Sequence, residues 1–446
     1  GLGVFSRVRL DTTRVDGRLA LRVATNDGWS TKPQFGYSTA GGSVTWLVGL
    51  AEDNLLGTAT SLMGIYSHTP DRNVFHLGYL NPHFLSRRAR LLLEVQDKSD
   101  GTHDSWFMGV PFYETAAARA LITTGDAASE RVLVYHRDAF GNPTPDAFER
   151  RLFRASLAGG IALHATTRDY QRLSLTAEVR RENFAPESTT VARSVFGAVG
   201  AAFDLGHPRF QVLERFNTYA RREDVDLSPT IHVGVWAAPQ AWGYPATEAG
   251  VGLEFSGQVS TLWGRGFAVL RGGGNGVFTA GAPDSGRVQG GVTVASQDLE
   301  RQTWILHVEG AALRRPRPGT QFDLWGTQNG PRLFAVHEFS GTRMVWIALE
   351  DRVLVADQVW GLMGIGIGAF VDYGGAWYPY APFAAYGGLP FPGEAPRLGG
   401  DLGLALRLGP TRAIRGDVGE FALGYRYGQG FAGSRWAIAI RKGVTY

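Results

Sequence analysis

The chain has 446 residues, and its 44 Lys and Arg nearly balance its 41 Asp and Glu, giving a formal net charge of +3. Acidic residues are interleaved with basic ones along the whole sequence, so no basic patch predicts nucleic-acid binding. The chain contains no cysteine, which excludes disulfides and thiolate metal sites. No run of about eighteen apolar residues is present, which excludes a transmembrane helix.

The composition favours many strands joined by tight turns. Glycine occurs 60 times, 12% of the residues are aromatic and only 44% are hydrophobic, which is less typical of a helical protein. A soluble chain of this length usually forms two or three domains, but a single closed sheet is also possible. Such a barrel can span a membrane, because its signal is weak alternation rather than a hydrophobic block.

Residues 1–32 are predicted to form two short strands around a turn at Asp16-Gly17. A bare terminal hairpin is one interpretation of this segment. The sequence begins at Gly1 without an initiator Met or a signal peptide, so we expect that an N-terminal region was processed, cut or left out.

From Pro33 onward the sequence predicts successive hairpins whose strands alternate in polarity. In residues 90–96 and 172–180 one register is apolar and the other carries charged and hydroxyl side chains. A water-soluble sheet with one wet face shows the same alternation, but such sheets seldom sustain it over a whole chain without a helix. The pattern therefore favours a barrel with an apolar outside and a polar lumen.

The last strands continue this alternation. Leu402, Leu404, Leu406 and Leu408 oppose Asp401 and Arg407, and an aromatic register in residues 421–427 opposes Glu420 and Arg426. The final segment, residues 435–446, alternates in the same way and ends on Tyr446.

The strongest functional signal lies in two predicted strands near residue 350. In residues 342–355, Trp346, Glu350 and Arg352 share one face, and in residues 362–377 the corresponding face carries glycines and Asp372. A glycine-lined face leaves room for another backbone to approach. The preceding loop, residues 314–341, is the nearest candidate, and it carries Arg332.

No enzyme signature is present. The glycine-rich residues 271–276 lack the Lys-Ser/Thr pair of a phosphate loop, and no Gly-x-Ser-x-Gly sequence occurs. His307 and Glu309 lie two residues apart, on the predicted lumen-facing side of one strand. This arrangement is more typical of a water-exposed polar pair than of a metal site. We therefore predict no catalytic residues, no metal and no cofactor.

The order of these motifs resembles the BamA/TamA superfamily of outer-membrane assembly barrels. In that family a loop Arg-Gly-Phe/Tyr tip enters the lumen and pairs with acidic residues of the following strands. Transferred by position, Arg332 is the loop arginine, Phe334 the aromatic residue, and Glu350 and Asp372 the acids of this loop lock. Leu333 stands where the family has glycine, so the tip is expected to adopt a different turn. The opposite interpretation is an exposed Arg332, with Glu350 paired to Arg352.

Other landmarks follow the same order. The Asn54-Leu55-Leu56-Gly57 turn, the turn at residues 79–84 and the terminal aromatic residue all resemble family features. Residues 1–32 resemble the last hairpin of a periplasmic POTRA domain, and residues 33–446 the outer-membrane barrel. The resemblance implies an all-β transmembrane antiparallel barrel of sixteen strands. About twenty segments alternate, so we assign some to extracellular extensions or to halves of long strands.

The resemblance also implies a function in the bacterial outer membrane. A client outer-membrane protein would bind at the seam between the first and last strands, next to outer-membrane lipid, for insertion or translocation. An alternative is a structural barrel that anchors periplasmic or surface partner proteins, which Leu333 favours, whereas a passive pore conflicts with a loop in the lumen. The predicted seam residues are Gln34, Phe35, Gly36, Tyr37, Ile438, Ile440 and Tyr446.

Overall fold

The structure is a computed structural model. It describes residues 5–15, 17–27, 30–138, 140–186, 194–219, 222–244, 249–279, 282–325, 329–381, 383, 393–411, 418–428 and 433–442. Within these ranges the chain forms strands and one short 3-10 helix, η1 (Gln240–Trp242). No helix in these ranges is long and apolar enough to cross a membrane.

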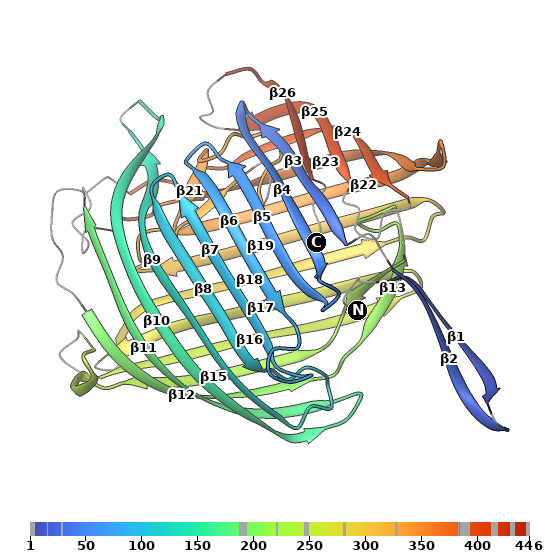
Figure 1. Cartoon of the computed structure of the whole chain (residues 1–446). Coiled ribbons are helices and arrows are strands. Elements are labelled where there is room, and N and C mark those ends of the chain that lie inside the picture. The colour runs from blue at the N-terminus through green and yellow to red at the C-terminus, as the bar shows by residue number, and fades with distance from the viewer. Residues whose placement is uncertain are drawn as a thin grey trace.

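A closed antiparallel barrel of 20 strands makes up most of the molecule (Figure 1). Its strands are β3 (Thr31–Ala40), β4 (Ser43–Leu55), β5 (Thr60–His68), β6 (Asn73–Asn81), β7 (Arg90–Lys98), β8 (Gly101–Val110), β9 (Arg119–Arg137), β10 (Pro143–Ala165), β11 (Tyr170–Pro186), β12 (Ser194–Gly206), β15 (Thr230–Ala238), β16 (Gly250–Trp263), β17 (Gly266–Thr279), β18 (Ala282–Ser296), β19 (Gln302–Arg314), β22 (Arg343–Val359), β23 (Met363–Trp377), β24 (Gly399–Pro410), β25 (Gly419–Gly428) and β26 (Trp436–Lys442). Each strand pairs with its neighbours in this order, and β26 returns to β3.

The prediction of sixteen strands is therefore wrong. That prediction assigns some alternating segments to hairpin extensions or to halves of longer strands. In the structure each wall strand pairs with two neighbours, because tight turns such as those at Gly41-Gly42 and Ser99-Asp100 separate even short segments into independent strands.

The N-terminal segment forms a separate hairpin. Strands β1 (Phe5–Val15) and β2 (Arg18–Asp27) pair only with each other among the described residues, and the hairpin projects away from the barrel (Figure 1). Leu19 and Leu21 are exposed on it. The assignment of this segment to a POTRA domain stays a prediction.

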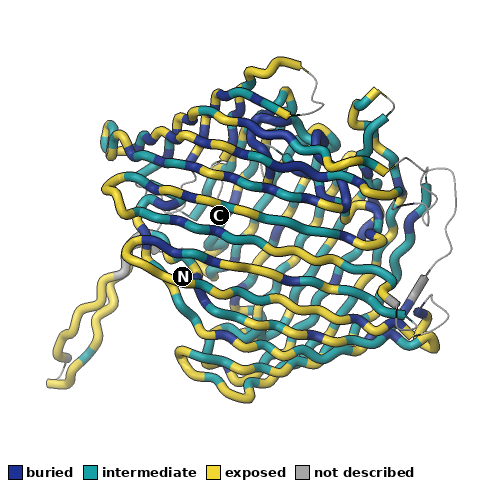
Figure 2. Tube along the Cα trace, turned by 180° about the vertical axis from the view of Figure 1, so that it is seen from behind, coloured by how far each residue is buried: buried dark blue, intermediate teal, exposed yellow. Residues whose placement is uncertain are grey.

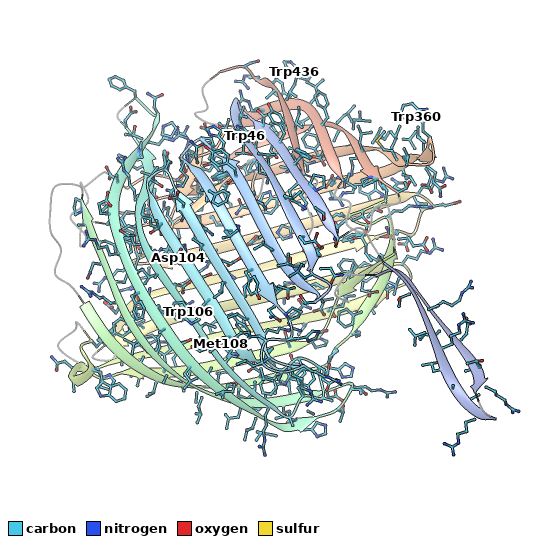
Figure 3. All side chains as sticks on the ribbon, in the orientation of Figure 1. Trp46, Asp104, Trp106, Met108, Trp360 and Trp436 are labelled. Carbon is cyan, nitrogen blue, oxygen red and sulfur yellow. The ribbon has the colours of Figure 1, made fainter. Side chains whose placement is uncertain are left out.

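The outward face of the barrel is apolar over a limited height. On β10, Phe153, Leu157 and Ile161 point outward and are about half exposed, whereas Glu149 and Arg151 occupy the outward positions beyond them. Figure 3 shows outward tryptophans on several strands, among them Trp46, Trp106 and Trp436. An apolar band with polar strand extensions beyond it is the surface pattern of a barrel in a bilayer.

Burial inside the barrel is uneven. Figure 2 shows buried positions concentrated on the C-terminal strands, and on β22, β23, β24 and β25 they alternate with more exposed ones. Alternate burial means that the lumen face of this wall is covered. Two segments, residues 315–341 and residues 207–229, supply the cover.

Candidate functional site

The first covering segment is the loop between β19 and β22, here called the lumen loop (residues 315–341). Two short strands, β20 (Phe322–Leu324) and β21 (Phe339–Gly341), pair at its base. Its tip, residues 330–334, is buried, and Arg332, Leu333 and Phe334 are each 0% exposed. The tip of this loop is therefore covered on all sides in the structure.

Arg332 binds carboxylates of the wall at the loop tip. Its Nε donates to Asp372 Oδ2 at 2.6 Å and its Nη2 to Asp372 Oδ1 at 3.1 Å, a two-point contact. Its Nη1 lies 3.0 Å from Glu420 and 3.6 Å from Glu350. The guanidinium also lies 3.9 Å from the centroid of the Phe370 ring. The contact with Asp372 makes Arg332 a buried lock rather than an exposed loop residue.

Further charges extend this contact. Glu350 also binds Arg352 at 2.8 Å and Arg407 at 3.1 Å, and Glu420 binds Arg407 at 2.9 Å and Arg441 at 2.9 Å. The alternative pairing of Glu350 with Arg352 therefore coexists with the lock. We call the following residues the lumen charge cluster: Arg332, Glu350, Arg352, Asp372, Asp401, Arg407, Glu420 and Arg441. These four arginines and four carboxylates are each at most 5% exposed. Ion pairs join seven of them, so those buried charges have partners of opposite sign, whereas Asp401 accepts the Leu333 N–H.

Leu333, at the position where the family that the sequence resembles has glycine, is packed in the structure. It is not among the described residues with positive φ, so its backbone does not need glycine. Its N–H donates to Asp401 Oδ2 at 2.8 Å. Its side chain joins a buried cluster on the lumen side, made with Ala40, Phe370, Ala405, Ala422 and Ala439. Small wall residues leave the space that this leucine fills.

Phe334 lies in a second apolar cluster beside the first. Its ring is 5.0 Å from that of Phe339, and the cluster also contains Leu324 and Met344. A Cβ on Gly399 would lie 2.9 Å from the Phe334 ring, which shows how closely the loop approaches β24. Phe334 therefore fixes the loop by packing, next to the ionic contact of Arg332.

Beyond the tip, the loop crosses to the first strands of the barrel. A Cβ on Gly41, which has φ +56, would lie 2.3 Å from the Ala335 nitrogen, so only glycine fits there. The Val336 N–H donates to Ser43 Oγ at 3.2 Å. One loop thus contacts both sides of the junction between β26 and β3.

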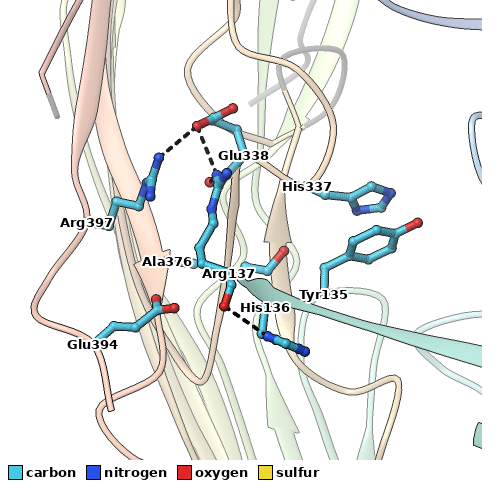
Figure 4. A pocket seen from close by; sticks show the side chains of 9 residues that line it. Tyr135, His136, Arg137, His337, Glu338, Ala376, Glu394 and Arg397 are labelled. Atoms are coloured by element: carbon cyan, nitrogen blue, oxygen red, sulfur yellow. Dashed lines mark hydrogen bonds and ion pairs between the residues drawn. The ribbon is translucent and has the colours of Figure 1, made fainter. Parts of the chain in front are cut away.

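His337 and Glu338 attach the loop to the opposite wall. His337 contacts Asp323 at 2.5 Å and Asp71 at 2.9 Å, and its ring stacks on Tyr135 at 3.4 Å. Burial lowers the pKa of His337, but its two carboxylate partners outweigh burial and raise the pKa to about 9. Figure 4 shows Glu338 between Arg137 and Arg397, at 2.9 and 3.2 Å.

The junction between β26 and β3, here called the seam, has few paired residues. Within the described ranges Ala439 lies opposite Ala40 and Ile440 opposite Thr39, and the register contains no other pair. The neighbouring β3–β4 ladder, by contrast, runs unbroken from Thr31 to Ala40.

The predicted seam residues are only partly at this pairing. Ile440 takes part in it, and Ile438 lies on the same outward face of β26. The segment Gln34, Phe35, Gly36 and Tyr37 lies further along β3 and pairs with β4. Residues 443–446, which continue the chain after β26, are outside the described residues. Tyr446 lies outside the described residues.

The second covering segment is a hairpin between β12 and β15, here called the lumen hairpin (residues 207–229). It contains β13 (Phe210–Glu214) and β14 (Arg222–Asp226). Phe216 and Leu227 are buried against Phe267 and Ile305 on the lumen face of β17 and β19. Because strands alternate in direction, this hairpin enters from the end where the chain enters β3, and the lumen loop enters from the other end.

The lumen hairpin corrects one prediction. We expected the lumen loop to cover the glycine face of β23, but Tyr219 of the hairpin lies there. A Cβ on Gly364 would lie 2.7 Å from the Tyr219 ring, and one on Gly366 would lie 2.1 Å from its hydroxyl. Arg352 Nη1 also donates to the Phe216 carbonyl at 2.9 Å, so the hairpin contacts the lumen charge cluster.

Sequence analysis missed several residues of the site. Asp401, Arg407, Glu420 and Arg441 all contribute to the lumen charge cluster, yet none follows a family motif. The sequence does contain a signal for them, because each is a charged residue on the strand face opposite the outward apolar side chains. Which of them meet depends on strand register, and the sequence does not specify register across turns.

Fold and site together define a large membrane-type β-barrel with two segments folded into its lumen. No family model and no characterised protein matches the sequence. Among solved structures, the chain resembles BamA from Haemophilus ducreyi lacking POTRA domains 1-3 (13% identity, TM-score 0.42), covering 98% of this chain and 75% of that one.

The chain also resembles two CdiB structures at 11% identity. CdiB from Escherichia coli matches with a TM-score of 0.47 over 98% of this chain and 68% of its own. CdiB from Acinetobacter baumannii matches with a TM-score of 0.46 over 98% of this chain and 65% of its own. At these identities and scores the similarity concerns the fold alone.

Proposed function

We propose that the protein is a bacterial outer-membrane barrel that inserts or exports client proteins through the seam between β3 and β26. The observation that carries this proposal is the short pairing at the seam among the described residues, Ala439 with Ala40 and Ile440 with Thr39. Unpaired backbone groups at a strand edge can template another strand, so a client strand has a place to add there. In this proposal the protein acts on client proteins and outer-membrane lipid without covalent chemistry or a cofactor.

The lumen loop gives this seam a closing element. Leu333 packs against Ala40 on one side of the seam and Ala439 on the other. Arg332 holds the same tip on β23 and β25 through Asp372 and Glu420. The loop therefore stabilises the closed seam from inside, and its release would favour opening.

A crosslink across the seam tests the proposal. Thr39 and Ile440 lie opposite each other on the outward face, and the natural chain has no cysteine to interfere. A Thr39→Cys/Ile440→Cys barrel in liposomes is expected to lose acceleration of client-barrel insertion when oxidised and to regain it when reduced. Leu423→Cys/Ile438→Cys is the matched control, because these residues pair between β25 and β26, away from the seam. Equal insertion by oxidised and reduced seam variants would refute the lateral route.

A structural barrel that anchors a periplasmic or surface partner is the second candidate. The observation that favours it is the number of places at which the lumen loop is attached. The loop is fixed to the C-terminal strands, to Ser43 and to β9. An anchor requires no opening. It predicts that the reduced and wild-type barrels fail to accelerate insertion of any client, although they fold and remain in the membrane.

A further inference from the structure

A cavity of about 460 Å³ lies between the lumen loop and the inner face of β9, β10 and β11. Its lining includes several arginines from both sides: Arg72, Arg131, Arg150, Arg180 and Arg317. The volume is in the range of small-molecule sites. The wall strands separate the cavity from the lipid-facing surface, so a ligand would enter from the aqueous lumen.

Three guanidinium groups converge on one carboxylate in this cavity. Glu182 Oε1 lies 3.0 Å from Arg150, and Glu182 Oε2 lies 2.6 Å from both Arg180 and Arg317. Arg150 also binds Glu130 at 3.0 Å, and Lys98 binds Glu130 at 2.6 Å. We call these six residues the basic pocket: Lys98, Glu130, Arg150, Arg180, Glu182 and Arg317. Four cations and two carboxylates give it a net charge of +2.

Nearby charges reduce this excess without cancelling it, because the pairs beside the pocket are neutral and two carboxylates share one imidazole. Arg72 lies 3.4 Å from Asp100, and Asp71 and Asp323 both bind His337 at the other end of the cavity. Arg154, on the strand beside Arg180, has its own partner in Glu178 at 2.6 Å. Like charges held this close repel one another, so an added anion would stabilise the pocket.

The arginines have donors left for such an anion. Arg180 and Arg317 each use one terminal nitrogen for Glu182, and a guanidinium has five N–H donors. Among the described residues, Arg180 Nε has no hydrogen-bond partner. Arginine forks match phosphate oxygens in two-point contacts. We propose that the basic pocket binds the phosphate group of a small soluble molecule, a function separate from the seam.

Glucose 6-phosphate is a suitable probe, because its dianionic phosphate matches the charge and its size fits the volume. Calorimetric titration of the full chain in detergent is expected to show binding, and unphosphorylated glucose is expected to show none. Arg180→Gln and Arg317→Gln should each weaken binding about tenfold or more. Arg271→Gln is the matched control, since Arg271 binds Gln258 and does not line the cavity.

A variant that is expected to bind more tightly distinguishes a true loss of binding from misfolding. Glu182→Gln removes the competing carboxylate, so it is expected to tighten binding of glucose 6-phosphate. Equal affinities of inorganic phosphate and glucose 6-phosphate would still support a phosphate site. No binding by the wild-type barrel at millimolar ligand, or equal loss in Arg271→Gln and Arg180→Gln, would overturn it. So would native mass spectra in which phosphatidylglycerol binds and neither soluble phosphate compound does.

Discussion

The two segments inside the barrel are held in different ways. The tip of the lumen loop combines buried ion pairs around Arg332 with apolar packing of Leu333 and Phe334, whereas the lumen hairpin is fixed mainly by apolar packing around Phe216. Ion pairs depend on specific partners and on protonation, but apolar packing depends on shape and area. This difference predicts that loss of a single charge releases the loop, and that the hairpin stays packed on the wall when the loop is released.

The largest expected effect comes from Arg332→Ala. It leaves Asp372 without its two-point partner in a site that water does not reach, so it should destabilise the barrel by about 4 kcal/mol. Chymotrypsin should then cleave after Phe334 and Phe339 in the loop while the barrel stays folded. Arg154→Ala is the control: its side chain is 46% exposed, so we expect a loss below about 1 kcal/mol in urea unfolding. A loop that resists chymotrypsin in Arg332→Ala would contradict the ionic lock.

Phe216→Ala perturbs the other segment. Phe216 is 1% exposed and its ring lies 5.7 Å from that of Phe267, so the cavity left behind should cost about 3 kcal/mol. Amide hydrogen exchange is expected to rise in residues 210–219 and to stay unchanged in residues 329–338. If both regions exchanged faster, the two segments would form one cooperative unit and the comparison would fail.

Leu333→Ala separates packing from charge within the loop tip. The substitution removes apolar contacts with the seam alanines and leaves Arg332 in place, at a cost of about 2–3 kcal/mol. Reduced Thr39→Cys/Ile440→Cys barrels that carry it should form their disulfide more slowly, because the seam is less well held. Leu404→Ala is a control on the outward face of β24, where 69% of the residue is exposed. Unchanged disulfide kinetics would show that Leu333 does not help to hold the seam closed.

A smaller effect is expected from pH. His337 titrates with its pKa raised to about 9, against about 6.5 in an unfolded chain, so its contribution is complete below pH 6.5. The contribution is lost as pH rises through about 9, which amounts to roughly 2 kcal/mol between pH 7 and pH 9. Chymotrypsin cleavage of the lumen loop should rise over that window, and His337→Gln should abolish the dependence. A flat profile in the wild type would show that Asp71 and Asp323 do not hold a charged imidazole.

The sequence predicted the parts of this arrangement that depend on alternation. The lumen-facing register of Glu350 and Arg352, and that of Asp372, follows from period two and agrees with the burial pattern. The barrel itself was predicted as well, but the strand count was wrong because alternation does not show where one strand ends and a partner begins. Tyr219 could not be predicted at the glycine face, because an inserted hairpin is fixed by contacts between residues distant in sequence.

A distance measurement across the seam tests the central claim that the lumen loop holds the seam closed. Tyr37 on β3 and Leu423 on β25 both face outward, so spin labels at these positions report the width of the junction without entering the lumen. Pulsed electron paramagnetic resonance in lipid nanodiscs should give one narrow distribution for the otherwise wild-type barrel. Arg332→Ala should add a second, longer population. Identical distributions in the two barrels, with the loop of Arg332→Ala shown to be cleavable by chymotrypsin, would contradict the claim.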